Sequence, residues 1–338
     1  MSVMSTDSLP LTFLNQNLDY TERIVEELEY IVSDTDLLSD GKHMGKVRDT
    51  YDCGDHLILV TTDRHSSFDR IIAHIPFKGQ VLNLVSAWWF EQTANLVPNH
   101  VLAVPDPNVT VAKKCRVVPI EFVIRGYITG STNTSLWTVY NQGSREYCGN
   151  PLPDGLQKNQ KLEKPLLTPT TKEVEHDRPI SPKEIVAEGW MSSAEWEETS
   201  AIAFRLFSEG QRQALQHGLI LVDTKYELGR DKDGQCIVID EIHTPDSSRY
   251  WLADSYEKRI ASGLEPENID KEFLRLWFRD HCDPYADAEL PAAPEDLVVE
   301  LARRYIYLYE RITGRAFPFP EQHEQTSQRI KRNLENYL

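Results

Sequence analysis

In the stretch "LILVDTKYELGRDKDGQCIVIDEIHTPDSSRYW" (219–251), the first apolar run carries charged residues at every second position from Asp223 to Glu227. Its two β-branched runs around "GRDKDG" predict a β-hairpin. Because side chains alternate between the two faces of a strand, Asp223, Lys225 and Glu227 share one face, and the even-numbered residues form a core face. The sequence therefore predicts a strand with one charged face.

The pairing of this hairpin decides where Asp240 lies. If Leu228 pairs near Gln235, Asp240 joins the charged face, and a one-residue slip turns it away. Two carboxylates with a lysine between them suit Mg²⁺ bound to nucleotide phosphates, since Mg²⁺ combines a few carboxylate oxygens with phosphate oxygens. A solvated outer face with cross-strand ion pairs is the alternative interpretation.

Helical periodicity appears in three parts of the chain. Residues 17–34 are amphipathic, and residues 81–97 are apolar at helical spacing up to Pro98, which ends the segment. The C-terminal quarter, from about Asp270, is also helical in pattern.

Two capping boxes are predicted in the middle of the chain. Ser181 and Ser192 each precede a glutamate by three residues, Glu184 and Glu195. The second box opens a helix that runs to about His217 and ends at a glycine.

The remaining segments indicate an α+β fold, with no internal repeat and no strict βαβ alternation. Turn-rich strands fill residues 45–74, and residues 115–130 form a long β-prone run. The Pro-rich insert at 149–182 is long for a structureless loop, and such loops are commonly lids or binding loops. We expect three regions: a β-rich N-terminal lobe with a phosphate-binding hairpin (1–115), an α+β lobe (116–265) and a helical C-terminal region (266–338).

The 338-residue chain carries a formal net charge of -17, which makes nucleic acid a poor candidate partner. An anionic substrate therefore needs a locally basic pocket. The five scattered cysteines favour reduced thiols and a cytoplasmic protein without structural zinc. The sequence predicts neither a membrane span nor a secretory signal.

Two loops carry candidate binding residues. "GKVRDTYDCGD" (45–55) has a glycine that lets the backbone approach phosphates, and two cations, Lys46 and Arg48. "TTDRHSSFD" (61–69) follows a buried strand, where sites are commonly built. An ordinary tight turn and a polar turn with local backbone bonds are the respective alternatives.

A third stretch, "FVIRGYITGS" (122–131), places Arg125 in an apolar strand before two glycines and Ser131. The guanidinium fork suits a phosphate, and Ser131 adds a hydroxyl donor. A buried pair between Arg125 and a carboxylate explains the same residues equally well.

These stretches occur together and in order in one family. The chain resembles SAICAR synthetase (phosphoribosylaminoimidazole-succinocarboxamide synthase) from about Gly45 to Phe317. The resemblance rests on "GKVRDTYD", "TTDRHSSFD", "KGQVLNLVSAWWF", "RGYITGS", "TPTTK…EHD…IS", "LVDTKYELG" and "IDEIHTPDSSRYW". Two positions depart from the family: His65-Ser66-Ser67 stands where Ile-Ser-Ala is usual, and His243 where a Leu-type residue is usual.

The resemblance implies ATP-dependent ligation of L-aspartate to 5-amino-1-(5-phospho-ribosyl)imidazole-4-carboxylate through an acyl phosphate, giving SAICAR, ADP and phosphate in purine biosynthesis. It implies a monomer or small homo-oligomer and Mg²⁺ as the cofactor. It assigns Lys225 and Asp223 to catalysis and Glu227 and Asp240 to the metal. It assigns the ATP site to Gly45, Lys46, Arg48 and Glu121, and the substrate site to Asp69, Arg125, Ser131 and Arg249.

Two other classes fit parts of the pattern. A small-molecule kinase on a related ATP-binding scaffold needs a general base, for which Asp69 or Asp223 could serve, and it releases ADP without aspartate. A nucleotide-binding regulatory module without turnover predicts loss of the metal carboxylates, whereas Glu227 and Asp240 are both present.

Overall fold

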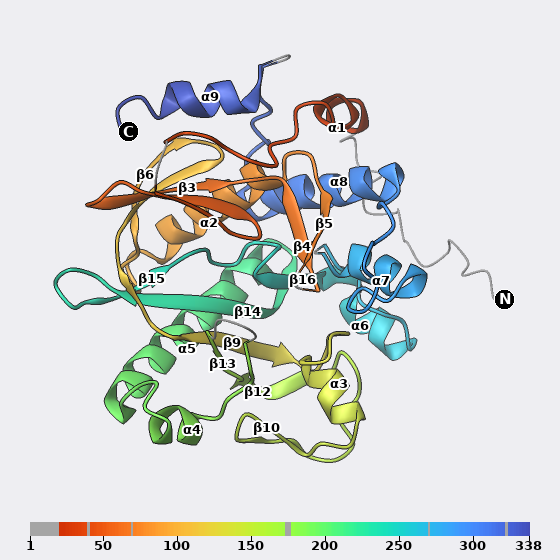
Figure 1. Ribbon diagram of the computed structural model, residues 1–338. Helices are drawn as coiled ribbons and strands as arrows, with labels where there is room; N and C mark the ends of the chain where they lie inside the picture. Colours follow the sequence, from red (N-terminus) through yellow and green to blue (C-terminus); the bar gives the residue numbers. More distant parts are fainter. Residues whose placement is uncertain (1–19, 39–40, 69, 173–176, 270, 322–323) are drawn as a thin grey trace.

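The computed structural model describes residues 20–38, 41–68, 70–172, 177–269, 271–321 and 324–338. Its architecture is α+β, as predicted, with two separate antiparallel sheets (Figure 1). The first has five strands in the order β1-β2-β3-β7-β6, which cover Lys42–Met44, Arg48–Asp52, His56–Thr61, Val109–Lys113 and Val101–Asp106.

The second sheet is built around β14 (Leu219–Arg230), which pairs with β9, β15, β16 and β8. Strands β12 and β13 extend it by pairing with β9. The bounds of these partners are Ile120–Tyr127 (β9), Cys236–Ile239 (β15), Ser248–Leu252 (β16), Arg116–Val117 (β8), Lys161–Leu167 (β12) and Thr170–Thr171 (β13). Two small ribbons pair β4 (Arg64–Ser67) with β5 (Arg70–His74), and β10 (Glu146–Tyr147) with β11 (Asn150–Pro151).

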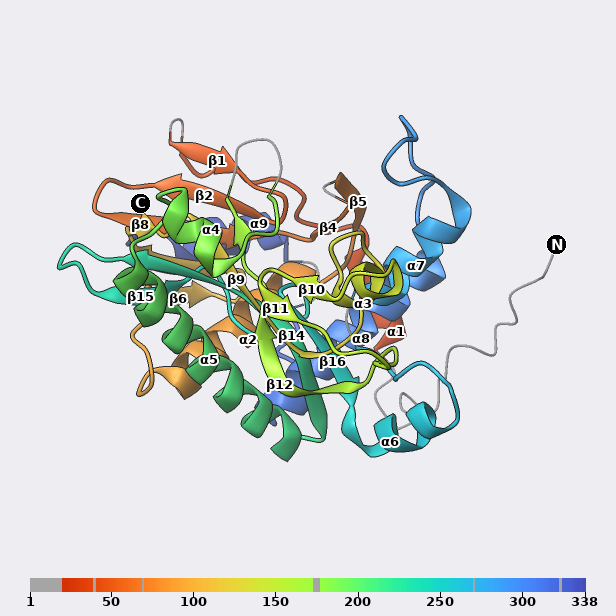
Figure 2. The same cartoon turned by 90° about the horizontal axis from the view of Figure 1, so that it is seen from below.

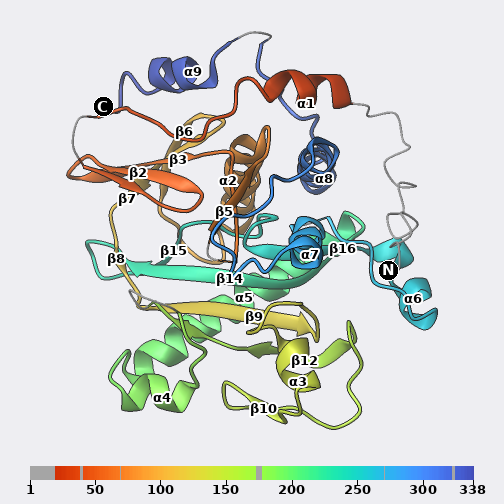
Figure 3. The same cartoon turned by 45° about the vertical axis from the view of Figure 1, so that its right-hand side comes forward.

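Helices cover these sheets. Helix α2 (Lys78–Thr93) packs on the first sheet, and α5 (Ser193–Gln216) lies across β9 and β14 of the second (Figure 2). The C-terminal α8 (Glu295–Thr313) packs against α2 (Figure 3). The other helices are α1 (Thr21–Glu27), α3 (Leu136–Asn141), α4 (Pro182–Ala187), α6 (Ala253–Ala261), α7 (Glu272–His281) and α9 (Thr326–Asn333).

One large core joins α2, α5, α8 and the second sheet, and a smaller one lies beneath α9. In the smaller core, Ile330 of α9 and Leu334 directly after it pack with Tyr51 and Ile58 of the first sheet. The C-terminal helices are thus packed into the N-terminal half of the molecule. The three region boundaries stay predictions.

Local signals were good guides to the helices. Both capping boxes are confirmed: the Ser181 and Ser192 hydroxyls accept the backbone N–H of Glu184 and Glu195, and both glutamates bond back. Helix α5 ends where predicted, because Gly218 adopts a positive φ of 72° that other residues adopt only with strain.

Three predicted elements differ in extent. Helix α1 ends at Glu27 and not near residue 34; residues 17–19 lie outside the described part of the chain. Helix α2 spans 78–93 and not 81–97, because its last turn loosens before Pro98. The insert at 149–182 is not a structureless loop, since it supplies β12 and β13, which pair with β9.

The hairpin register is also corrected. Leu228 faces Val238, not Gln235, and the last strand pair is Arg230 with Cys236. The turn is closed by the Asp231 carboxylate, which accepts the backbone N–H of Asp233 at 3.0 Å and of Gln235 at 2.9 Å. This side-chain closure sets a register that strand patterning alone did not indicate.

Candidate active site

The charged face of β14 lies in the middle of the second sheet. Asp223 faces Arg125 of β9 on one side and Arg249 of β16 on the other. The Asp223 carboxylate is 2.5 Å from the Arg249 guanidinium and 3.8 Å from that of Arg125. Arg125 also donates from Nε to the Thr168 hydroxyl at 2.9 Å. Adjacent strands thus hold a buried arginine, Arg125, and a half-buried one, Arg249, on one carboxylate.

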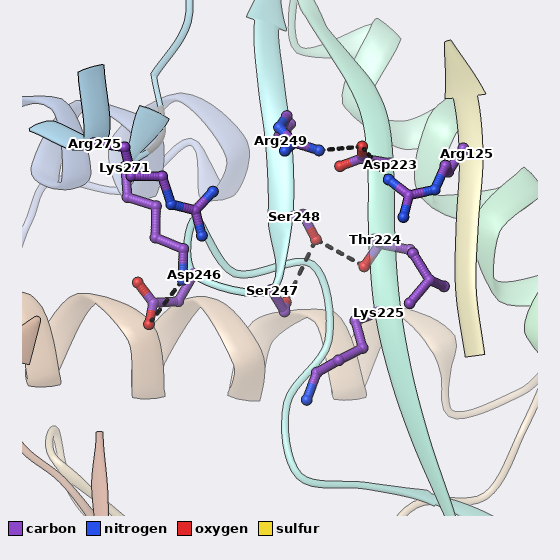
Figure 4. Close-up of a pocket in the computed structure, with 11 residues that line it drawn as sticks. Arg125, Asp223, Thr224, Lys225, Asp246, Ser247, Ser248, Arg249, Lys271 and Arg275 are labelled. Atoms are coloured by element: carbon purple, nitrogen blue, oxygen red, sulfur yellow. Dashed lines mark hydrogen bonds and ion pairs between the residues drawn. The ribbon is translucent and has the colours of Figure 1, made fainter. Parts of the chain in front are cut away.

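A cavity of about 140 Å³ opens above this face (Figure 4). Five cations and two carboxylates line it, a formal excess of three positive charges in a chain whose net charge is -17. Glu121, Glu227 and Glu272 lie just outside this lining and offset part of the excess. The cations face the cavity together, so the cavity is suited to an anionic ligand. Its charged lining residues are Arg125, Lys225, Arg249, Lys271, Arg275, Asp223 and Asp246.

Asp246 organises the end of the cavity opposite Asp223. Its carboxylate lies 3.2 Å from the Lys78 ammonium and 3.7 Å from that of Lys271, and it accepts the Tyr305 hydroxyl at 3.1 Å. Burial alone would raise the pKa of Asp246, but the charges of Lys271 and Lys78 hold it well below its usual range. Burial lowers the pKa of Lys271 to about 8, with Arg275 and Lys78 adding to the effect and Asp246 opposing it.

Lys225 connects the cavity to a group of carboxylates. Its ammonium is 2.8 Å from both Glu121 and Glu227, and Lys172 pairs with the other oxygen of Glu227. Burial would raise the pKa of Glu227, but Lys225 and Lys172 lower it to about 2. The Lys225 side chain is 32% exposed, so it is accessible from the cavity side.

Asp240 lies near the carboxylates around Lys225, but strand pairing does not put it there, contrary to the prediction from the sequence. In the observed register, Asp240 would fall on the same face as Tyr226. Strand β15 instead ends at Ile239, and Asp240 takes a left-handed φ of 63°, so its carboxylate meets Arg48 at 2.5 Å. Burial raises the pKa of Asp240 to about 6, with Arg48 opposing and Glu227 adding to the effect.

The phosphate-binding hairpin lies next to this point. Gly45 and Lys46 are in the turn between β1 and β2, and Arg48 begins β2 and pairs with both Asp240 and Glu241. The turn is braced by Arg64, which donates to the Gly45 carbonyl at 3.0 Å and to Asp49 at 2.7 Å. The "TTDRHSSFD" stretch, predicted as a loop, instead contains strand β4, and Arg64 at the start of that strand supports the hairpin.

One predicted substrate residue lies in a different cavity. Ser131 donates to Glu272 in a neighbouring cavity of about 240 Å³, and among the described residues the two cavities share Arg249 alone. Asp69 lies outside the described residues, so its place in the site stays a prediction.

The two departures from the family pattern are buried histidines. His243 bonds the Tyr226 hydroxyl through Nε2 at 2.6 Å and packs edge-on to Trp89, with ring centroids 4.5 Å apart. Burial lowers the pKa of His243 to about 3 and holds that of His65 well below 6.5. Both are neutral near pH 7, and neither lines the cavity.

Glu227 and Asp240 fit a nucleotide-bound cation better than a self-contained metal site. In the described part of the chain, no three His, Cys, Asp or Glu side chains are grouped to hold a metal ion. An ion held by these two carboxylates would therefore need further oxygens, and Mg²⁺ in phosphoryl-transfer sites takes them from phosphates and water.

Sequence reasoning missed several charged residues at the cavity. Lys78 and Lys271 stand at the starts of helices that were interpreted only as scaffold, and Arg275 lies one turn further along α7. Lys172 was inside a quoted motif without a role. The sequence indicated their role only weakly, because a lysine or arginine near the end of a helix is ordinarily exposed to solvent.

Comparisons with known proteins give the same assignment throughout. The SAICAR synthetase family model matches residues 42–291. A phosphoribosylaminoimidazole-succinocarboxamide synthase of Legionella pneumophila (strain Lens) is 62% identical over 311 residues, which cover 92% of this chain and 100% of the relative. The chloroplastic synthase of Arabidopsis thaliana is 60% identical over 93% of this chain and 78% of its own length.

Solved structures agree. A SAICAR synthase from Saccharomyces cerevisiae complexed with SAICAR has a TM-score of 0.72 at 30% identity, covering 85% of this chain and 100% of that chain. A SAICAR synthetase in complex with ADP shares the fold, with a TM-score of 0.63 at 24% identity over 82% and 100% of the two chains.

The fold and the cation-lined cavity are therefore those of an ATP-dependent C–N ligase acting on small anionic molecules. More particularly, the chain belongs to the SAICAR synthetase family. Enzymes of this family join L-aspartate to the aminoimidazole carboxylate ribotide in purine biosynthesis, and this chain is an enzyme of that kind.

Proposed function

We propose that the cavity beside β14 binds the ribotide, with Arg125 and Arg249 at its phosphate and its reacting carboxylate directed toward Lys225. The excess of three positive charges on the cavity wall carries this proposal. Arginine forks suit phosphate bidentately, and here both are preoriented by Asp223. In this assignment Asp223 acts by positioning the arginines.

The reaction then proceeds in two steps. A ribotide carboxylate oxygen attacks the γ-phosphorus of ATP, ADP leaves, and an acyl phosphate remains. The aspartate amine attacks the acyl carbon, the bond from that carbon to the phosphate oxygen breaks, and the amine loses a proton. A free carboxylate is a poor electrophile because its charge repels nucleophiles, so activation is required.

Positioning and charge neutralisation supply most of the catalysis in phosphoryl transfer. In this proposal Lys225 faces the transferred phosphoryl group, which its position between the cavity and the carboxylates supports. The ATP side is formed by Gly45, Lys46, Arg48 and Glu121. Glu227 and Asp240 would hold Mg²⁺ brought with the nucleotide, and such an ion neutralises phosphate charge during transfer.

An assay of ADP release, with each substrate omitted in turn, tests this function. We expect sustained ADP release only when both the ribotide and L-aspartate are present. Sustained release with the ribotide alone, unaffected by aspartate, would reject the ligase reaction and favour the kinase alternative.

The expected cellular location and oligomeric state follow from the same proposal. We expect a cytoplasmic enzyme, a monomer or small homo-oligomer that does not bind nucleic acid. No helix in the described ranges is long and apolar enough to cross a membrane.

A further inference from the structure

A buried arginine, Arg64, is bonded to the turn between β1 and β2, which the proposed function places on the ATP side. Its side chain is 1% exposed. Arg64 donates from Nη1 to the Ser33 carbonyl at 2.6 Å and from Nη2 to the Gly45 carbonyl at 3.0 Å. The same Nη2 donates to the Asp49 carboxylate at 2.7 Å. One guanidinium therefore joins the turn, strand β2 and the segment before β1.

A second contact holds the other end of this turn. Thr62 follows strand β3, which pairs with β2, and it is completely buried. Its backbone N–H and its hydroxyl donate to the Val47 carbonyl at 2.9 Å and 2.7 Å. The carbonyls of Gly45 and Val47 thus both accept hydrogen bonds from residues 62–64.

Asp49 links Arg64 to the segment before β1. Its carboxylate is completely buried, and it accepts the backbone N–H of Thr35 at 2.9 Å and the Thr35 hydroxyl at 2.7 Å. Ser33 and Thr35 lie outside residues 42–291, which match the family model. Arg64 is therefore held in part by a segment that precedes the matched region.

The direction of the peptide groups decides whether such a turn can bind phosphate. Successive backbone N–H groups attract an anion, whereas a carbonyl oxygen carries partial negative charge and repels it. The carbonyls that Arg64 and Thr62 hold cannot rotate toward a phosphate without breaking these bonds. The described lining of the substrate cavity includes neither residue, so their contacts with the turn are separate from that cavity.

We propose that Arg64 and Thr62 are positioning residues for the ATP phosphates, because they fix the orientation of the peptide groups at residues 45–47 without touching the nucleotide. This inference rests on the proposed function, since it takes the β1–β2 turn as part of the ATP site.

Steady-state kinetics of Thr62→Val and Arg64→Lys test the inference. Valine has the shape of threonine but lacks the hydroxyl bond to the Val47 carbonyl, so the KM for ATP should rise about three- to tenfold. Lysine keeps a positive charge beside Asp49 but cannot make all three bonds of the planar guanidinium. The kcat/KM for ATP should therefore fall about ten- to a hundredfold in Arg64→Lys. The KM values for the ribotide and L-aspartate should change by less than about twofold in both variants.

Thr93→Val and Arg329→Lys are the matched controls. Thr93 is completely buried and donates to the Trp89 carbonyl at 2.8 Å within α2. The Arg329 side chain is 7% exposed and donates to both oxygens of Asp106 in the first sheet, at 3.0 Å and 3.2 Å. These contacts lie outside the turn. Both controls should lower the thermal unfolding temperature as the test variants do, and leave the KM for ATP unchanged.

Lys46→Gln separates failure of this inference from failure of the ATP site. Lys46 belongs to the proposed ATP site itself, so its replacement should raise the KM for ATP. If it does, while Thr62→Val and Arg64→Lys shift the KM for ATP no more than their controls, the positioning role is wrong and the ATP site stands. If Lys46→Gln leaves that KM unchanged, the turn is not part of the ATP site and the inference fails with it. Should Arg64→Lys not fold, the comparison of Thr62→Val with Thr93→Val decides alone.

Discussion

Replacing Asp246 by asparagine tests whether one buried carboxylate stabilises the end of the cavity where Lys78 and Lys271 meet. The Asp246 and Lys78 side chains are 5% and 0% exposed, and Lys271 is 16% exposed. Asparagine keeps the size of the side chain but removes its charge. The change leaves two ammonium groups close together without a carboxylate between them.

The expected cost is large. Breaking a buried ion pair by removing one partner costs about 3–5 kcal/mol, because the remaining charge is uncompensated. With a slope of about 3 kcal/mol per molar urea, this lowers the unfolding midpoint by roughly 1 M or more. A second change, Lys271→Met, removes one of the two orphaned ammonium groups and should restore part of the loss.

The effect should depend on pH. The folded pKa of Asp246 is depressed, so its stabilisation is present above the unfolded value of about 3.9 and is lost as pH falls through the folded value. The pKa of Lys271 is lowered to about 8, so wild-type stability rises between there and the unfolded value of about 10.4. Without Asp246 this rise begins at lower pH. The difference between wild type and Asp246→Asn is therefore greatest between about pH 4 and the further lowered pKa of Lys271 in the variant, and it decreases toward pH 10.

Urea unfolding followed by tryptophan fluorescence at pH 3, 7 and 10 measures these differences. Asp154→Asn is the control, because Asp154 is 88% exposed in its pair with Arg145 and should contribute about 0–1 kcal/mol. A loss below about 1 kcal/mol for Asp246→Asn at pH 7 would contradict the reasoning and place Asp246 in the same class as that surface pair.

Two further predictions concern the ligands. Glu227→Gln and Asp240→Asn should leave a folded enzyme that needs far more Mg²⁺ and turns over slowly, as activity titrated against Mg²⁺ will measure; curves superimposable on wild type would indicate purely structural ion pairs. Arg125→Ala and Arg249→Ala should raise the KM for the ribotide about ten- to a hundredfold and affect that for ATP much less. An unchanged ribotide KM in both would show that the phosphate lies elsewhere.

The sequence predicted those parts of the fold that local chemistry determines. The two capping boxes depend on side chains three residues from their partners, and both are present. The ends of α2 and the pairing of β12 depend on contacts with distant segments, which the pattern does not contain. The predicted register of the hairpin was wrong, although its cause is local. The Asp231 carboxylate closes the turn, and strand alternation does not show this.

The site was predictable to the extent that strand alternation determined it. Asp223, Lys225 and Glu227 share a face because the strand period is two, and the structure keeps that order. Lys78 and Lys271 could not be found in this way, because they belong to helices that reach the cavity from the first half and the last quarter of the chain. Their role depends on tertiary packing.

A charged face in the middle of a sheet persists only where adjacent strands neutralise it. In β14, Asp223 is flanked in register by arginines from both neighbours, and Lys225 lies between two glutamates. The two carboxylates of the lining neutralise only part of the charge of its five cations, and in the proposed function the substrates supply further negative charge. Because the whole chain carries a net charge of -17, anionic substrates are repelled by its surface and attracted only where the cavity focuses positive potential.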